Sequence, residues 1–153
     1  MNLTPSRQAI IAALEASQDL SNLLGVDPAD KTKPAIFSTQ RVPPPVYPCI
    51  TYAFTSVSPD PRFTPTAAET AISGVGEGSI HEFRCELRAY DKGKVSRRDL
   101  IVEAVKTTLV GQVLSLTTGT LFRVEMLAEI HDQWDSFLNA SFVILRLRLL
   151  YSA

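Results

Sequence analysis

The sequence has little of three features that often reveal a function, namely cysteine, net charge and long apolar runs. Its two cysteines, Cys49 and Cys85, cannot form a disulfide framework, and neither belongs to a CxxC or Cys/His motif, so we expect a reducing compartment and no metal or other cofactor. The net charge of −1 implies no bulk attraction to nucleic acid or to an anionic membrane. The most apolar run, residues 142–151, is too short to span a bilayer, and residues 1–25 lack the features of a secretory signal. These absences predict a soluble protein that does not bind membranes.

What is present fits one globular domain, which we place at residues 1–153. Hydrophobic residues make up 45% of the chain and charged residues 20%, as in ordinary globular proteins of this length. Residues 6–16 are predicted to form a helix with Thr4 as its N-cap, and its apolar stripe continues to Gly25, with a break near Ser17. A second helix is predicted at residues 96–109, where Ser96 and Asp99 resemble a capping box. Its solvent face is expected to carry Arg97, Arg98, Glu103 and Lys106, and its apolar face Leu100, Ile101, Ala104, Val105 and Leu109.

Strands are predicted at residues 35–38, 49–58, 80–90, 120–130 and 139–151, with a connection at 131–137. The last strand is expected to place Val143, Leu145, Leu147 and Leu149 on one face and Arg146 and Arg148 on the other.

The clearest strand signal lies at residues 82–89, where Phe83, Cys85, Leu87 and Ala89 alternate with charged residues. A period of two places one set on the core face and the other on the opposite face. The order of helices and strands therefore predicts an α+β fold, in which one mixed or antiparallel sheet of four to five strands has two helices packed on one face. The opposite face would carry a ladder of arginine and glutamate.

Three groups of residues are candidates for a chemical site. His81 and Cys85 share a strand face, but four residues of strand separate them by about 13 Å, too far for a nucleophile and its base. Residues 74–78 contain three glycines but lack the strand, the helix and the lysine of a phosphate-binding loop. His131, Asp132 and Asp135 lie in one predicted loop and define a remote alternative, a small hydrolase. We expect a protein that is not an enzyme.

The charged residues of the strands allow two interpretations. They form either a solvated face with cross-strand ion pairs or a surface for a partner. The residues are Glu82, Arg84, Glu86, Arg88, Arg123, Glu125, Arg146 and Arg148.

A 21-residue insert, residues 59–79, joins two predicted strands. Connections of this length in compact domains are usually functional or disordered. We expect the insert to be an arm that reaches a neighbouring subunit or another protein, with Phe63 as its apolar anchor.

The order of these features is similar to that of a known family. A helix ending in Leu23-Leu24-Gly25 leads through a proline-containing stretch to Tyr47-Pro48-Cys49-Ile50-Thr51-Tyr52. The insert, the charged strand at residues 81–90 and the serine-initiated helix at residues 96–109 follow. Over residues 6–151 the chain resembles the tail terminator, or tail completion (tail-to-head joining), proteins of long-tailed phages and phage-like particles. Its 59–79 insert is longer than is typical of them.

The resemblance implies a structural virion protein located in the tail or neck and assembled in the host cytoplasm. Six copies would form a ring on the head-proximal end of the tail tube, stop tube polymerisation and join the tail to the head connector. DNA could pass through the lumen without sequence-specific binding. The alternative is a connector, adaptor or other minor tail subunit. The residues expected at interfaces are Pro43, Pro44, Pro45, Phe63, Arg84, Arg88, Arg146 and Arg148.

Overall fold

The structure is a computed structural model, and it describes residues 4–39, 43–56, 80–115 and 120–152. The helices of this part of the chain are α1 (Thr4–Ala16), α2 (Gln18–Leu23) and α4 (Val95–Leu109). Its strands are β1 (Ile36–Ser38), β2 (Cys49–Ser56), β3 (Ile80–Asp91), β4 (Leu114–Ser115), β5 (Thr120–Asp135) and β6 (Ala140–Ser152).

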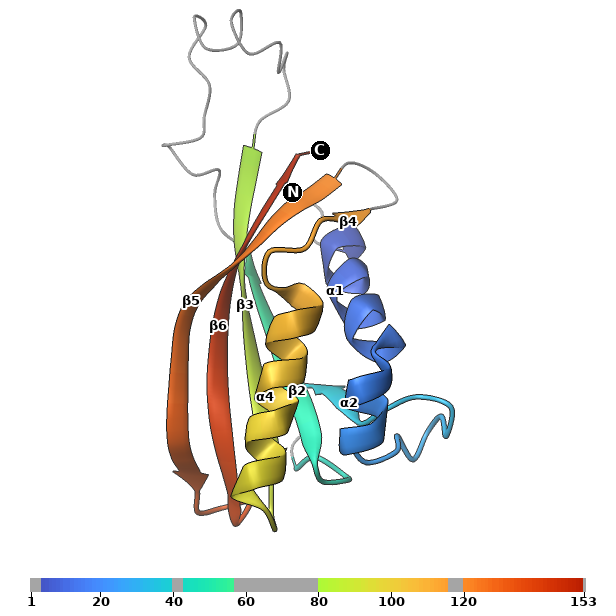
Figure 1. Cartoon of the computed structure of the whole chain (residues 1–153), viewed down its shortest axis with the longest axis vertical. Helices are drawn as coiled ribbons and strands as arrows, with labels where there is room; N and C mark the ends of the chain where they lie inside the picture. Colours follow the sequence, from blue (N-terminus) through green and yellow to red (C-terminus); the bar gives the residue numbers. More distant parts are fainter. Residues whose placement is uncertain (1–3, 40–42, 57–79, 116–119, 153) are drawn as a thin grey trace, which may run out of the picture.

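The strands form one open sheet in the order β1-β2-β3-β6-β5-β4. β1 runs parallel to β2 and all other neighbours are antiparallel, so the sheet is mixed. The helices α1, α2 and α4 lie together on one face of this sheet (Figure 1). The predicted α+β fold is therefore confirmed. Within the described residues, the sheet exceeds the predicted four to five strands only by the two-residue β4.

The main core lies between the helices and this face of the sheet. β6 contributes Val143, Leu145, Leu147 and Leu149, each at most 1% exposed. Because side chains alternate along a strand, these residues share one face, as their two-residue period predicts. The helices contribute the apolar residues Ile10, Leu14, Leu20, Ile101, Val105 and Leu109. This contact fixes the helices on the sheet and leaves its other face free of them.

The helix-free face carries the predicted ladder of arginine and glutamate only in part. The charged residues occupy the part of this face nearest the start of β3. Beyond that, a second apolar cluster includes Tyr90, Phe142 and Ile144, and the rings of Tyr90 and Phe142 lie 5.0 Å apart. Tyr47 packs on this cluster from the proline-containing segment, which therefore covers the end of the sheet.

The first predicted helix is divided at Ser17, where a break was expected. Ser17 caps α2, because its hydroxyl accepts a hydrogen bond from the backbone N–H of Leu20 at 3.3 Å. α2 ends at Leu23, and Gly25 follows in close contact with the proline-containing segment. A Cβ at Gly25 would lie 2.4 Å from Cγ1 of Val46, so a larger residue would push this segment away. The backbone N–H of Gly25 also donates to Pro48 O at 2.9 Å.

The start of α4 corrects the predicted capping box. The helix begins at Val95 after Lys94, which makes no side-chain capping bond. Asp91, at the end of β3, holds the turn before the helix instead, since its carboxylate accepts the backbone N–H groups of Gly93 and of the N-cap residue Lys94 at 2.7 and 3.0 Å. The predicted faces of α4 also need two corrections. Arg98, expected in solvent, is 2% exposed, whereas Leu100, expected in the core, is 57% exposed.

The predicted connection at residues 131–137 was wrong, because β5 continues to Asp135 and the turn occupies residues 136–139. Polar residues at 131–135 suggested a loop, but here they belong to the exposed end of a strand. The register of β5 against β6 shifts at three places, between Leu121 and Arg123, Met126 and Ala128, and Ile130 and Gln133. Such bulges bend an edge strand and limit its pairing with other chains.

Candidate interaction surface

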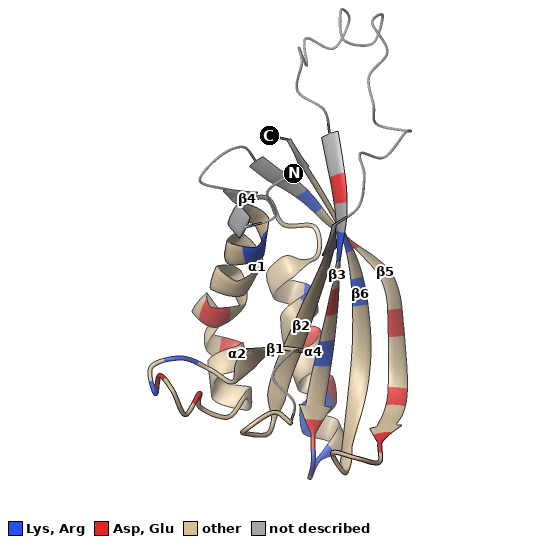
Figure 2. Cartoon of the chain, turned by 180° about the vertical axis from the view of Figure 1, so that it is seen from behind, with Lys and Arg blue, Asp and Glu red and all other residues tan. Residues whose placement is uncertain are grey.

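Eight charged side chains cross β3, β6 and β5 on the helix-free face, and we call them the charged band. Its members are Glu82, Arg84, Glu86, Arg88, Arg123, Glu125, Arg146 and Arg148. Strand register brings them together, since Glu86 lies opposite Arg146 and Arg148 lies between Arg84 and Glu125. Blue and red segments accordingly lie side by side on β3, β5 and β6 (Figure 2).

Ion pairs connect the band within and between strands. On β3, Nε of Arg88 lies 2.7 Å from Glu86, whose other oxygen lies 3.5 Å from Nε of Arg146 on β6. On the other side of β6, Nε of Arg148 donates to Glu125 at 2.9 Å. The Arg84 and Arg146 guanidinium groups make the longest contacts of the band, at 3.4 and 3.5 Å. These two are therefore the least engaged cations of the band.

Three of the five arginines lie further out than the acids, whereas the side chain of Arg148 is only 16% exposed. The side chains of Arg84, Arg123 and Arg146 are 61%, 63% and 54% exposed. Those of Glu82, Glu86 and Glu125 are 5%, 28% and 24% exposed. With five arginines and three glutamates the band has a net charge of +2. The sheet therefore presents mainly guanidinium groups to its surroundings.

A shallow hollow of about 260 Å³ lies in the middle of the band. Arg84, Glu86 and Arg146 line it together with Leu127, which is 44% exposed. Leu127 lies at the bulge between Met126 and Ala128, where the register of β5 shifts. An exposed leucine among arginines gives this hollow an apolar contact as well as positive charge. The predicted interface residues Arg84 and Arg146 thus meet here, with Arg88 and Arg148 beside them in the band.

The proline-containing segment lies beside a second hollow, of about 320 Å³. Pro44 is buried and helps to line this hollow, whereas Pro43 and Pro45 are exposed. Thr51 lies in its wall, 4% exposed, and its hydroxyl has no hydrogen-bond partner among the described residues. The remaining predicted contact residue, Phe63, and the whole 59–79 insert lie outside the described residues.

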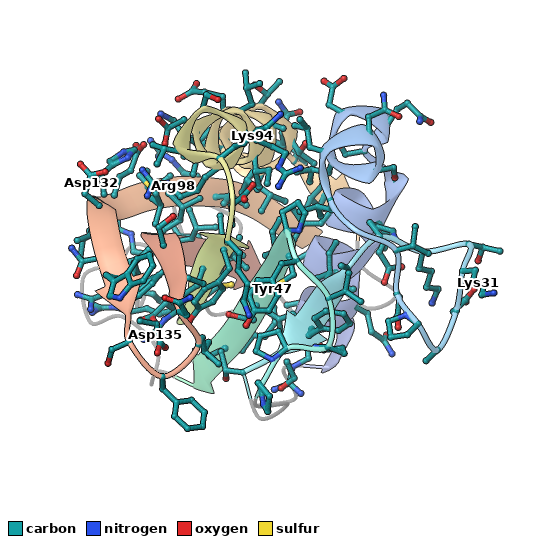
Figure 3. The ribbon with its side chains drawn as sticks, turned by 90° about the horizontal axis from the view of Figure 1, so that it is seen from below. Lys31, Tyr47, Lys94, Arg98, Asp132 and Asp135 are labelled. Carbon is teal, nitrogen blue, oxygen red and sulfur yellow. The ribbon has the colours of Figure 1, made fainter. Side chains whose placement is uncertain are left out.

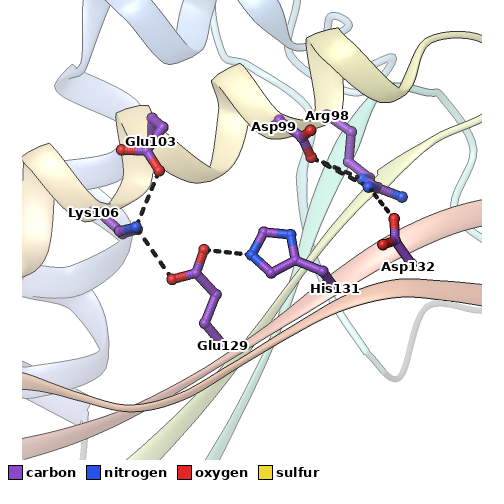
Figure 4. A network of polar contacts seen from close by, with 7 residues as sticks. All are labelled: Arg98, Asp99, Glu103, Lys106, Glu129, His131 and Asp132. Atoms are coloured by element: carbon purple, nitrogen blue, oxygen red, sulfur yellow. Dashed lines mark hydrogen bonds and ion pairs between the residues drawn. The ribbon is translucent and has the colours of Figure 1, made fainter.

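A second group of charges connects α4 to β5 (Figure 4), and we call it the α4–β5 network. Arg98 donates to Asp132 at 3.0 Å and to Asp99 at 3.2 Å. Lys106 lies 3.0 Å from Glu103 and 3.2 Å from Glu129, and Glu129 also lies 2.6 Å from His131. Four carboxylates share two permanent cations, so the network has a net charge of −2 while His131 is neutral.

The network explains one pKa shift. Burial alone would raise the pKa of Glu129, but hydrogen bonds from His131 and Lys106 outweigh burial and lower it. Glu129 therefore stays ionised between Lys106 and His131, and its contact with Lys106 holds the strand to the helix.

The residues of the hydrolase alternative have separate structural partners. His131 contacts Glu129, and Asp132 contacts Arg98. Asp135 accepts the backbone N–H groups of Phe137 and Leu138, both at 3.0 Å, and so holds the β5–β6 turn. Figure 3 shows Asp132 beside Arg98, with Asp135 apart from both. The structure does not bring these residues together around one pocket.

Cys85 lies in the main core at 2% exposure, as expected for a small core residue. Burial raises the pKa of its thiol far above the usual range and raises that of Cys49 to about 12. Both thiols are therefore protonated at neutral pH and poorly nucleophilic. The side chain of His81 lies outside the described part of the chain.

The described residues contain no group of three or more His, Cys, Asp or Glu side chains placed to hold a metal ion. None of their helices is both long and apolar enough to cross a membrane.

Comparison with solved structures finds a similar chain in the virion of a native gene transfer agent particle. The TM-score is 0.68, and the alignment covers 98% of this chain and 96% of that chain, at 16% sequence identity. The two chains share one fold. No protein-family model matches the sequence, and a search of curated proteins finds no match. The fold class is thus shared with a virion component over nearly the whole length of both chains.

Proposed function

We propose that this chain is a structural virion protein of a phage-like particle. The observation that carries the proposal is the fold shared with a gene transfer agent virion chain over 98% of this chain. A match over nearly full length leaves little room for an additional domain with another task in this sequence. The separate partners of His131, Asp132 and Asp135 also favour a role that involves no catalysis.

Within the virion, the proposed role is that of a tail terminator. Several copies, six by the resemblance of the sequence, form a ring on the head-proximal end of the tail tube, stop its growth and receive the head connector. A closed ring of identical subunits needs two different complementary patches on each copy. The charged band and the proline-containing segment are surfaces that the helices leave free, which fits this requirement.

The 59–79 insert has a proposed role in the same assembly. It joins β2 to β3, and we expect it to contact a neighbouring subunit or the tail tube through Phe63. Deleting residues 60–78 should leave the thermal unfolding midpoint close to that of the full chain and abolish ring formation or tube capping. If the deletion variant still forms rings that cap tubes like those of the full chain, the insert is dispensable for assembly.

The test of the main proposal is the mass of the purified protein, alone and mixed with the tail-tube protein. We expect a ring that binds tube ends and limits tube length. A strict monomer that neither binds tubes nor changes their length would contradict the proposal. A ring of twelve copies at the head portal would instead support the connector alternative.

A further inference from the structure

Two surfaces on different sides of the sheet have opposite charge and matching apolar centres. The charged band, on the helix-free face, carries +2 and surrounds Leu127. The exposed surface of α4, on the helix-covered face, carries Asp99, Leu100 and Glu103, which we call the acidic ridge. We propose that the acidic ridge of one copy docks on the charged band of the next copy. This inference rests on the proposed ring and names its subunit contact.

The charged band has free capacity for a carboxylate at its central hollow. Arg84 and Arg146 border the hollow and are more than half exposed, and among the described residues their ion pairs with glutamates are long, at 3.4 and 3.5 Å. A guanidinium group offers five N–H donors, so each arginine can donate to a further carboxylate without losing its present partner. Leu127 at the same place favours a protein over a nucleic acid, because a phosphate gains nothing from an apolar contact.

The acidic ridge supplies the matching groups. Residues three and four apart lie side by side on a helix, so Glu103 is next to both Asp99 and Leu100. The side chains of Asp99 and Glu103 are 51% and 66% exposed, and Leu100 is 57% exposed. The ridge belongs to the α4–β5 network, in which carboxylates outnumber permanent cations by four to two. An exposed leucine beside two exposed carboxylates is complementary to an exposed leucine beside two arginines.

The positions of the surfaces also fit a ring. α4 packs on one face of the sheet and the charged band occupies the other, so a copy cannot use both surfaces for the same neighbour (Figures 1 and 2). Contact between two different patches is heterologous, and heterologous contacts generate rings or filaments, whereas a self-complementary patch generates a two-fold dimer. The ridge and the band therefore give the head-to-tail contact that a ring requires.

Charge reversal tests the contact in the full chain. One variant carries Arg84→Glu and Arg146→Glu, and the other carries Asp99→Lys and Glu103→Lys. Each should be a monomer by native mass spectrometry at a concentration where the wild type is assembled. An equimolar mixture of the two variants should assemble again with equal numbers of each. When the two variants alternate, every contact joins either two reversed surfaces or two native ones, and both combinations pair opposite charges.

A control variant carries Lys31→Glu and Lys33→Glu, which gives the same charge change as the arginine variant. Lys31 lies on the far side of the molecule from Arg98 and Asp132 (Figure 3). This control should assemble like the wild type. Circular dichroism and thermal unfolding check that every variant is folded. If a reversal variant does not fold, Leu100→Ser and Leu127→Ser replace it, and each should lower the assembled fraction.

The outcomes separate this contact from the proposed function. A wild type that assembles, with folded reversal variants that also assemble, overturns the contact and leaves the ring proposal standing. Folded variants that stay monomeric when mixed also overturn it, because the loss then does not arise from this pair of surfaces. A wild type that is itself monomeric overturns the ring and the contact together.

Discussion

Along β6, neighbouring residues belong to two different environments. Leu145 and Leu147 face the helices and are 1% and 0% exposed, whereas Arg146, between them, faces away from the helices and its side chain is 54% exposed. The helix-covered face gains its stability from apolar area removed from water, which does not depend on ion pairs or on the ionisation of side chains. The charged half of the other face consists of ion pairs in contact with solvent, each worth little. The comparison indicates that one face holds the fold and the other is available for contact.

The largest effect on stability should come from the helix-covered face. Leu147→Ala removes a fully buried side chain, and both the lost transfer energy and the remaining cavity should lower the free energy of unfolding by about 2–5 kcal/mol. Urea unfolding followed by circular dichroism measures this change. Leu100→Ala, on the exposed side of α4, is the matched control under dissociating conditions and should change the stability of the monomer by less than about 0.5 kcal/mol. Equal losses of unfolding free energy in the two variants would contradict the placement of Leu147 in the core and Leu100 on the surface.

Arg98 tests the connection between helix and edge strand. Arg98→Ala removes a buried stem and the links to Asp99 and Asp132, and it should cost about 1–3 kcal/mol of unfolding free energy. Arg98→Met keeps most of the apolar stem and removes only the charge, so its loss should be smaller. Chemical denaturation of both variants separates packing from charge. A methionine variant as unstable as the alanine variant would show that the ion pairs dominate.

Asp91 tests the turn that leads into α4 and the pH dependence of its stability. Asp91→Asn should cost about 1–2 kcal/mol, because the fully buried carboxylate accepts Arg97 and two backbone N–H groups. Burial alone would raise the pKa of Asp91, but these hydrogen bonds outweigh it and lower the pKa. The stabilisation is therefore present above the unfolded pKa, about 3.9, and is lost as the pH falls through the lower folded pKa. Thermal unfolding from pH 7 to pH 2 should show a smaller acid-dependent loss in the variant than in the wild type.

The smallest effect on stability should come from the charged band. Arg146→Gln removes a guanidinium that is 54% exposed and lies 3.5 Å from Glu86, which keeps its 2.7 Å contact with Arg88, so the monomer should lose less than about 0.5 kcal/mol. Its thermal unfolding midpoint, measured under dissociating conditions, should stay near that of the wild type. A loss of unfolding free energy as large as that of Leu147→Ala would contradict the inference that the charged face contributes little to the stability of the fold.

The sequence predicted the parts of the fold that depend on local pattern. The two-residue period at 82–89 and the alternation of leucine and arginine in the last strand placed the core face correctly, because one buried face strongly constrains register. The break at Ser17 also followed from a local rule, since serine is a good N-cap. The α+β class followed from the order of these elements.

Other features needed contacts between distant residues. Arg98 was expected in solvent because arginine is rarely buried, but Asp132 on β5, 34 residues away, offers it a partner. Polar residues at 131–135 suggested a loop, yet pairing with β6 extends the strand through them. The aromatic cluster around Tyr90 and Phe142 also includes Tyr47, which the proline-containing segment brings over the end of the sheet. Sequence spacing contains no signal for such contacts.

The sequence by itself determined which residues of each strand face inward, because the alternation of side chains follows from backbone geometry alone. It also determined that charge would collect on one sheet face, though not how that charge would be distributed. Tertiary structure decided that three of the arginines lie outermost, that Arg84 and Arg146 flank an exposed leucine, and that α4 presents carboxylates on the other side. These properties depend on strand order, bulges and helix placement, which arise from contacts between segments far apart in the chain.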